Sequence, residues 1–154
     1  MGASTIPEAS AASKTRYVVT LTSGTSWTVP TGVTYVNATL VGGGGGGQGQ
    51  SGSTNYVTGT GLGGQIVATN VATTPGASIT YAIGAGGANN AQGGTTTFTG
   101  ATSAVGGRGY SATTTGTTGT AGLVSPNGGG VGTWVTSATG GTGGAGLIEI
   151  EYWV

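Results

Sequence analysis

Few side chains in this sequence could do chemistry. It contains no histidine, no cysteine and no aspartate, which removes the usual catalytic bases, thiolate nucleophiles and metal ligands. Serine and threonine abound, but a hydroxyl nucleophile needs a base beside it. Glu149 and Glu151 lie two residues apart on an expected strand, with Cα atoms about 6.6–6.8 Å apart, a separation that suits paired glycosidase carboxylates. Nothing around them indicates a cleft, so we favour a solvated strand face and expect no enzyme, cofactor or metal site.

Residues suited to binding occur within glycine-rich stretches. Tyrosine and tryptophan bring a large amphipathic surface at small entropic cost, arginine offers a donor fork for phosphate or carboxylate, and asparagine can hydrogen-bond hydroxyls. The candidate receptor-binding residues are Asn55, Tyr56, Arg108, Tyr110, Asn127 and Trp134. The same aromatic residues would also serve to cap a glycine bundle or to fill a subunit interface, and the sequence leaves these alternatives open.

Charge is nearly absent from the chain. The ionisable side chains that count are Glu8, Lys14, Arg16, Arg108, Glu149 and Glu151, and the net charge is zero. Nucleic acid and anionic lipid both require clustered lysine and arginine, so neither is an expected partner. No apolar run approaches the roughly 20 residues of a membrane span. The first sixteen residues also lack the hydrophobic core of a signal peptide, and we expect neither membrane insertion nor signal-directed secretion.

The elements that must position these residues begin with glycine tracts. Glycine supplies 37 of the 154 residues, more than three times its usual share of about 7%. Six consecutive glycines, Gly42–Gly47, follow directly on an expected strand, and further tracts lie at 59–64, 84–87, 106–109, 128–132 and 140–146. Glycine disfavours both strand and helix interiors, but extended polyglycine can form a left-handed threefold helix rising about 3.1 Å per residue. We expect such helices to pack together with interspersed Ala, Thr and Leu turned outward; floppy loops on a small β-sandwich are the alternative.

The remaining segments are typical of strands. Runs rich in β-branched and aromatic residues predict strands at 16–22, 26–29, 33–41, 65–71, 78–83, 95–99, 101–105 and 147–154. Gly32 and Gly76 stand in proline turns that favour positive φ at glycine. The last strand is the most apolar, which predicts a central place in its sheet. The fold class is therefore all-β, a small β-sandwich or jelly-roll-like arrangement with polyglycine II-like segments and no helices. We expect residues 1–15 to form a flexible arm or attachment segment and residues 16–154 to form one domain.

The order of these motifs resembles a known family. The series runs through Trp27-Thr28-Val29-Pro30, Gly42–Gly47, the stretch 74–87, Gly93-Gly94-Thr95, Gly106-Gly107-Arg108-Gly109 and Gly143-Gly144-Ala145-Gly146 before the final strand. Over about Tyr17 to Val154 it resembles the glycine-rich domain at the tips of bacteriophage tail fibres and related tail proteins. More distantly, it is similar to phage adhesins whose tips stack polyglycine helices and present variable loops.

This resemblance implies a tail fibre tip or adhesin component that contributes to host-cell recognition and attachment. It implies a place in the virion tail or fibre after synthesis in the host cytoplasm, and attachment to other tail proteins through the N-terminal arm. Host surface polysaccharide or an outer-membrane protein would be the receptor, and a homotrimer is expected by analogy with fibres. The chain lacks the long shaft of typical fibres. One alternative is a purely structural baseplate, collar or decoration subunit; another is an ice-binding bundle, for which the spacing of Thr and Ala in the tracts reads as irregular.

Overall fold

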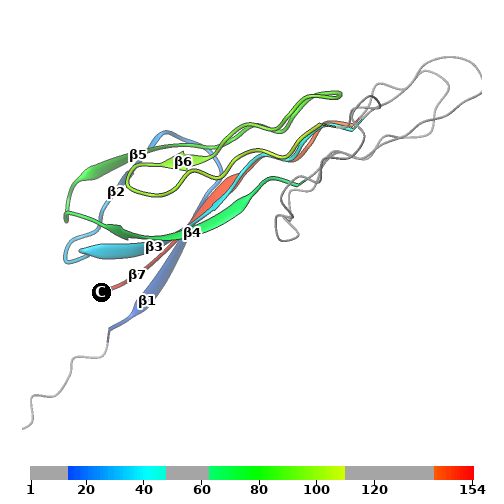
Figure 1. Cartoon of the computed structure of the whole chain (residues 1–154). Coiled ribbons are helices and arrows are strands. Elements are labelled where there is room, and N and C mark those ends of the chain that lie inside the picture. The colour runs from blue at the N-terminus through cyan, green and yellow to red at the C-terminus, as the bar shows by residue number, and fades with distance from the viewer. Residues whose placement is uncertain (1–13, 48–62, 110–140) are drawn as a thin grey trace, which may run out of the picture.

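The computed structural model describes residues 14–47, 63–109 and 141–154, and in these ranges the chain is all-β with no helix. The strands are β1 (Arg16–Leu21), β2 (Ser26–Thr28), β3 (Tyr35–Val41), β4 (Ile66–Ala72), β5 (Ser78–Ala82), β6 (Thr97–Phe98) and β7 (Leu147–Trp153). They form two antiparallel sheets, ordered β1-β7-β3-β4 and β2-β5-β6, as Figure 1 shows. The expected all-β fold with a small sandwich is confirmed. Residues 1–13 of the expected arm lie outside the described ranges.

The terminal strand β7 occupies the interior of the larger sheet, as its apolar pattern predicts. It pairs with β1 on one side and β3 on the other. Ile148, Ile150 and Tyr152 are buried, while the alternate positions Glu149 and Glu151 lie on the opposite face, as the two-residue period of a strand requires. The last strand therefore contributes one side of its pleat to the core between the sheets.

Aromatic side chains join the two sheets. Trp27 of β2 packs with ring centroids 6.4 Å from Phe98 and 6.0 Å from Tyr152, at interplanar angles of 44° and 50°, a tilted geometry that aromatic pairs favour. The buried cluster consists of Val29, Val33, Val36, Ala38, Leu40, Val71, Tyr81, Phe98, Ala104, Ile148, Ile150 and Tyr152. Gly32 and Gly76 have φ of 82° and 77°, which confirms the positive φ expected in the proline turns.

The expected strand at 101–105 is wrong. Gly100 turns the chain with φ of 90°, and only Ala104 makes a β-bridge, to Thr96. The carbonyl of Val105 accepts a hydrogen bond from the Gln65 amide at 2.8 Å, so the chain here already leaves the sheet for the glycine segments. The β propensity of residues 101–105 is a local property, so it could not predict that Val105 pairs with the distant residue Gln65.

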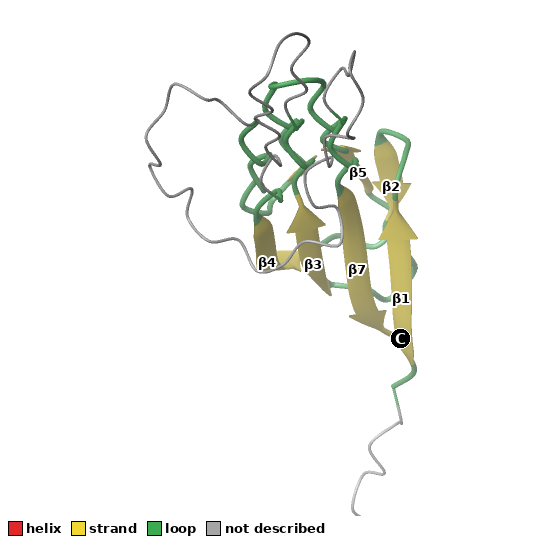
Figure 2. Cartoon of the chain, turned by 90° about the vertical axis from the view of Figure 1, so that its right-hand side faces the viewer, coloured by secondary structure: helices red, strands yellow, loops and turns green. Residues whose placement is uncertain are grey.

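The glycine segments continue out of the sheets as extended chains. In Figure 1 they run side by side away from the strands, and in the turned view of Figure 2 they lie above the end of the four-stranded sheet. Gly42 follows β3 directly, and β7 follows Gly146 directly. The same continuous segments of the chain thus contribute to both the bundle and the larger sheet.

Candidate functional site

Gly42–Gly47 is the axis of the glycine bundle, and all six residues are buried. Its amides donate hydrogen bonds to three neighbouring segments in turn, at 2.8–2.9 Å. Gly43 and Gly46 donate to the 91–94 segment, and Gly44 and Gly47 donate to the 141–144 segment. Gly42 donates to Gln65. Residues three apart therefore donate to the same neighbour. This is the threefold repeat of a polyglycine II helix, so in the described tracts the expected bundle is present in place of flexible loops. The tract at 128–132 and residues 59–62 lie outside the described residues.

Five segments surround this axis in the described part of the chain. Taken around the ring, they are 63–65, 105–109, 91–95, 84–88 and 141–146. The bonds that join each segment to the next are Gln65 N to Val105 O, Gly93 N to Gly107 O, Gly94 N to Ala85 O and Gly143 N to Gly87 O, at 2.7–2.8 Å. The axis also accepts bonds at the carbonyls of Gly43, Gly44 and Gly47. The backbone N–H and C=O groups of these segments thus bond to one another, whereas those of surface loops usually bond to water.

Close packing excludes any side chain from the axis. A Cβ built on Gly43, Gly45 or Gly46 would lie well inside the 3.0 Å that real Cβ atoms keep, each time against a neighbouring backbone carbonyl. A backbone carbonyl cannot turn away as a flexible side chain can. The glycines are therefore required by contact between backbones, the same steric reason that places glycine at the axis of collagen.

In four of the five ring segments, two glycines stand between two residues whose side chains point away from the axis. The outward pairs are Ala85 and Ala88, Gln92 and Thr95, Val105 and Arg108, and Thr142 and Ala145; all eight residues are exposed. The expectation that interspersed residues turn outward is confirmed for Ala and Thr in these segments, while Leu62 of the 59–64 tract lies outside the described residues. The spacing of Thr and Ala looks irregular along the sequence, but the outward residues are regularly spaced in these four segments. Each segment, however, contributes a row of only two described outward residues. Such short rows do not make the extended flat surface that ice binding would need.

Of the four positions that border the ranges 48–62 and 110–140, three meet at the end of the bundle away from the sheets. Gly47 donates to the Gly141 carbonyl at 2.8 Å and accepts from the Asn90 amide at 3.3 Å. A Cβ on Gly109 would meet the Asn90 carbonyl, so this segment ends beside the same turn. Residues 110–140 therefore begin and end at one end of a closely packed base, after Gly109 and before Gly141, and residues 48–62 begin there after Gly47. The 48–62 stretch rejoins the bundle nearer the sheets, because a Cβ on Gly64 would meet the Gly42 carbonyl.

Of the candidate binding residues, the structure places only Arg108. It is exposed on the outer side of the 105–109 segment. Asn55, Tyr56, Tyr110, Asn127 and Trp134 lie outside the described residues, so the structure does not test whether they come together. Arg108 stands two residues before Tyr110 and one before the bundle's far end at Gly109.

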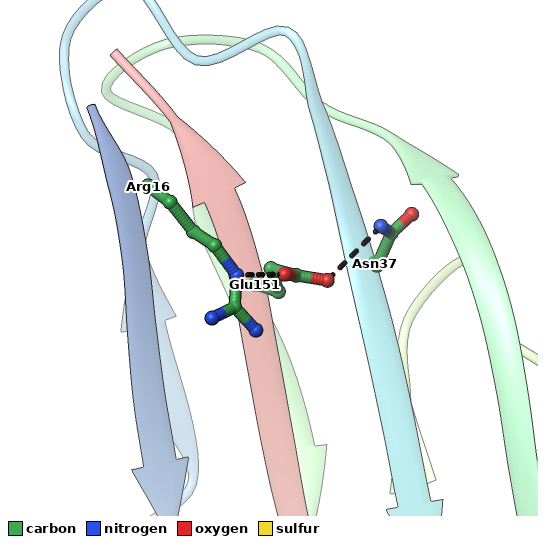
Figure 3. Close-up of polar contacts among 3 residues, drawn as sticks. All are labelled: Arg16, Asn37 and Glu151. Carbon is green, nitrogen blue, oxygen red and sulfur yellow. Dashed lines mark hydrogen bonds and ion pairs between the residues drawn. The ribbon is translucent and has the colours of Figure 1, made fainter. Parts of the chain in front are cut away.

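A polar network on the larger sheet was not foreseen from the sequence. Arg16 Nε donates to Glu151 Oε1, and Asn37 Nδ2 donates to Glu151 Oε2 at 3.3 Å (Figure 3). The β1–β7 and β3–β7 registers bring the three residues together, although Arg16 and Glu151 are 135 positions apart. The pKa of Glu151 is lowered first by the hydrogen bond from Arg16 and then by that from Asn37, while burial acts in the opposite direction. The expected solvated face holds for exposed Glu149, whereas Glu151 is engaged.

This network makes stability depend weakly on pH. Because the folded-state pKa of Glu151 is lowered, its contribution is present above the unfolded pKa and is lost as pH falls through the folded value. The effect is small because Arg16 is 60% exposed and exposed pairs contribute little. We expect Glu151→Gln to lower the melting temperature slightly at pH 7 and not at pH 2. The matched control Glu149→Gln, which removes the same charge two residues away, should give no such pH-dependent difference; equal profiles would contradict the prediction.

Comparison with known families finds a glycine-rich domain in this chain. A family model described as a glycine-rich domain matches residues 20–148. The chain belongs to the glycine-rich domain family. The match begins within β1 and ends within β7, so this glycine-rich domain includes both sheets and the described bundle. No curated protein matches the chain.

The described ranges add two findings about this glycine-rich domain. They hold no group of three or more His, Cys, Asp or Glu residues that could bind a metal ion. They also hold no helix with the length and apolar character needed to cross a membrane.

Proposed function

We propose that this glycine-rich domain is a bacteriophage tail fibre tip or adhesin component that contributes to host-cell surface recognition. The observation that carries the proposal is the meeting of Gly47, Gly109 and Gly141 at one end of the bundle. Residues 110–140 leave and return at that end, and residues 48–62 leave from it; both stretches contain candidate binding residues. A base with bonded backbone groups holds its ends in fixed places, and preorganisation lowers the entropic cost of binding.

The opposite end suits attachment to the virion. Thr15 and Val154 exchange two backbone hydrogen bonds at 2.8 and 3.0 Å, so the described start and end of the chain lie together. In Figure 1 they lie at the end of the sheets away from the glycine bundle. In this proposal the N-terminal arm joins other tail or fibre proteins, a homotrimer forms by analogy with fibres, and the receptor is a surface polysaccharide or an outer-membrane protein. The proposed role is binding, without catalysis.

Adsorption to host cells tests the proposal. Purified protein should adsorb to the host and block infection, and Tyr110→Ala combined with Trp134→Ala should weaken adsorption at least about tenfold, because aromatic residues dominate binding hot spots. Val105→Ala is the matched control, since it removes an exposed apolar side chain from the ring near the sheets. Folding of every variant is checked by thermal melting.

Two results would contradict parts of this proposal. Unchanged adsorption in the double variant would move the receptor site away from Tyr110 and Trp134. If the wild-type protein neither adsorbs nor blocks infection, the alternative is favoured, a structural baseplate, collar or decoration subunit. In that role the same aromatic residues would fill a subunit interface, as interfaces are enriched in them.

A further inference from the structure

The outer face of the four-stranded sheet carries an ordered set of polar and aromatic side chains. One row across the sheet consists of Val18, Glu151, Asn37 and Asn70, which are direct cross-strand partners from β1 to β4. The next row toward the chain ends holds Trp153 and Tyr35, whose exposed fractions are 38% and 62%. Continuing the β3–β7 register by two residues beyond Asn37 and Glu151 brings Tyr35 opposite Trp153. The two rows are roughly 6.8 Å apart along the strands.

This outer sheet face differs in composition from a protein-binding surface. Protein interfaces are depleted of charge at the centre and place polar groups at the rim. Here Glu151, Asn37 and Asn70 stand across the middle, Glu149 lies in the next row, and the large aromatic rings lie at one end. The arrangement combines a carboxylate and two amides with ring surfaces, so donors, acceptors and apolar area face the same side.

The charges of the face favour an uncharged ligand. Arg16 lies on this face, and its Nε is already bonded to Glu151. Thr15 continues the β1–β7 pairing to Val154, so exposed Lys14 falls on the same side as Arg16 by the two-residue period of a strand. With Glu149 and Glu151, the described residues of the face carry two positive and two negative charges, and neither an anionic nor a cationic ligand gains net attraction from it. A polyhydroxyl ligand would instead use the free acceptor and donor capacity of the amides and carboxylates.

We propose that the outer sheet face is a binding site for neutral sugar chains, with Trp153 and Tyr35 against the apolar face of a sugar ring. Asn37, Asn70 and Glu151 take its hydroxyl groups. The site lies on the sheet, away from the bundle end at Gly47, Gly109 and Gly141, and does not rest on the proposed role in host recognition. It is an open surface, so the affinity is weak, with Kd on the order of 1 mM.

Binding of the full chain to an oligosaccharide panel tests the inference without cells. The panel contains neutral hexose, N-acetylhexosamine, sialylated and phosphorylated oligosaccharides, and saturation-transfer NMR detects weak binding. We expect signals from neutral members only. Trp153→Ala should weaken binding about tenfold, while Trp153→Phe, which keeps a ring, should retain it within about threefold. Asn70→Ala, at an exposed position, is a second variant whose folding is less at risk.

Controls separate this site from the other possibilities. Val105→Ala removes an exposed apolar side chain elsewhere and should leave binding unchanged. The inference is overturned by absence of binding to every neutral sugar, by equal binding to the anionic members, or by unchanged affinity in both Trp153→Ala and Asn70→Ala. Loss of binding in Tyr110→Ala alone would place the sugar at Tyr110 and overturn this site while supporting the proposed function. Self-association that Trp153→Ala abolishes would assign the face to a second copy of the chain instead.

Discussion

Gly46→Ala should destabilise the folded domain by about 4 kcal/mol or more, among the largest effects a single methyl group can have. The added Cβ would collide with the Ala88 carbonyl, and the axis is surrounded by backbone that has no other place to go. Relieving the collision separates the axis from the 84–88 segment and strains the bond from Gly46 N to Ala91 O. Natural domains have only about 5–15 kcal/mol of total stability. Urea unfolding followed by far-UV circular dichroism measures the loss.

Gly76→Ala is the matched control for that experiment. A Cβ on Gly76 meets nothing within 4 Å, and the residue has φ of 77°, so the same substitution adds only conformational strain of about 1–2 kcal/mol. The difference between the two variants isolates the collision between backbones. If Gly46→Ala unfolds at the same urea concentration as Gly76→Ala, the axis is not closely packed and the bundle described above is wrong.

Thr96→Val should cost about 2–4 kcal/mol although it hardly changes the volume of the side chain. Thr96 is fully buried, and its hydroxyl donates to the Val41 carbonyl at 2.7 Å and accepts from the Gly84 amide at 3.0 Å. The hydroxyl joins the end of β3 to the beginning of the 84–88 segment. Valine leaves the buried Gly84 amide without this acceptor, and an unsatisfied buried group costs about 1–3 kcal/mol. Thermal unfolding gives the loss, and hydrogen exchange at Gly84 should become faster.

Thr99→Val provides the comparison for Thr96→Val. The Thr99 hydroxyl also makes hydrogen bonds, to the carbonyl of Thr80 at 3.1 Å and with its hydroxyl at 2.9 Å, but it is exposed. Water can replace those bonds, so the cost should stay below about 1 kcal/mol. Equal losses in the two variants would show that burial of the Thr96 hydroxyl has no special role.

The parts of the fold that depend on local pattern could be predicted from the sequence. The alternation of Ile148, Ile150 and Tyr152 with two glutamates predicts both the strand and its buried side, and six consecutive glycines predict a backbone-only packing element. Proline turns predict the positive φ of Gly32 and Gly76. Each of these signals lies within a few residues, because side-chain period and backbone preference are local properties.

The parts that depend on register could not be predicted. The contact of Arg16 with Glu151 requires the β1–β7 pairing, and no nearby residue reports it. The expected strand at 101–105 failed for the same reason, since the partner of Val105 is Gln65. The three-residue spacing of outward side chains in the ring segments could not be recognised until burial showed which residues point outward. Of the candidate binding set, the structure places Arg108 alone, so those side chains remain a prediction.

The continuity of bundle and sheet determines how the domain would bear a mechanical load. A pull between the far end of the bundle and the chain's N-terminal side runs along extended backbone from Gly42 into β3 and from Gly146 into β7. Because β1, β7 and β3 are antiparallel neighbours, the pull would slide these strands lengthwise, and their hydrogen bonds, which lie across the strands, would be loaded in shear together. An extended polyglycine chain has little slack to give up at about 3.1 Å per residue. The domain would therefore transmit tension stiffly between its two ends.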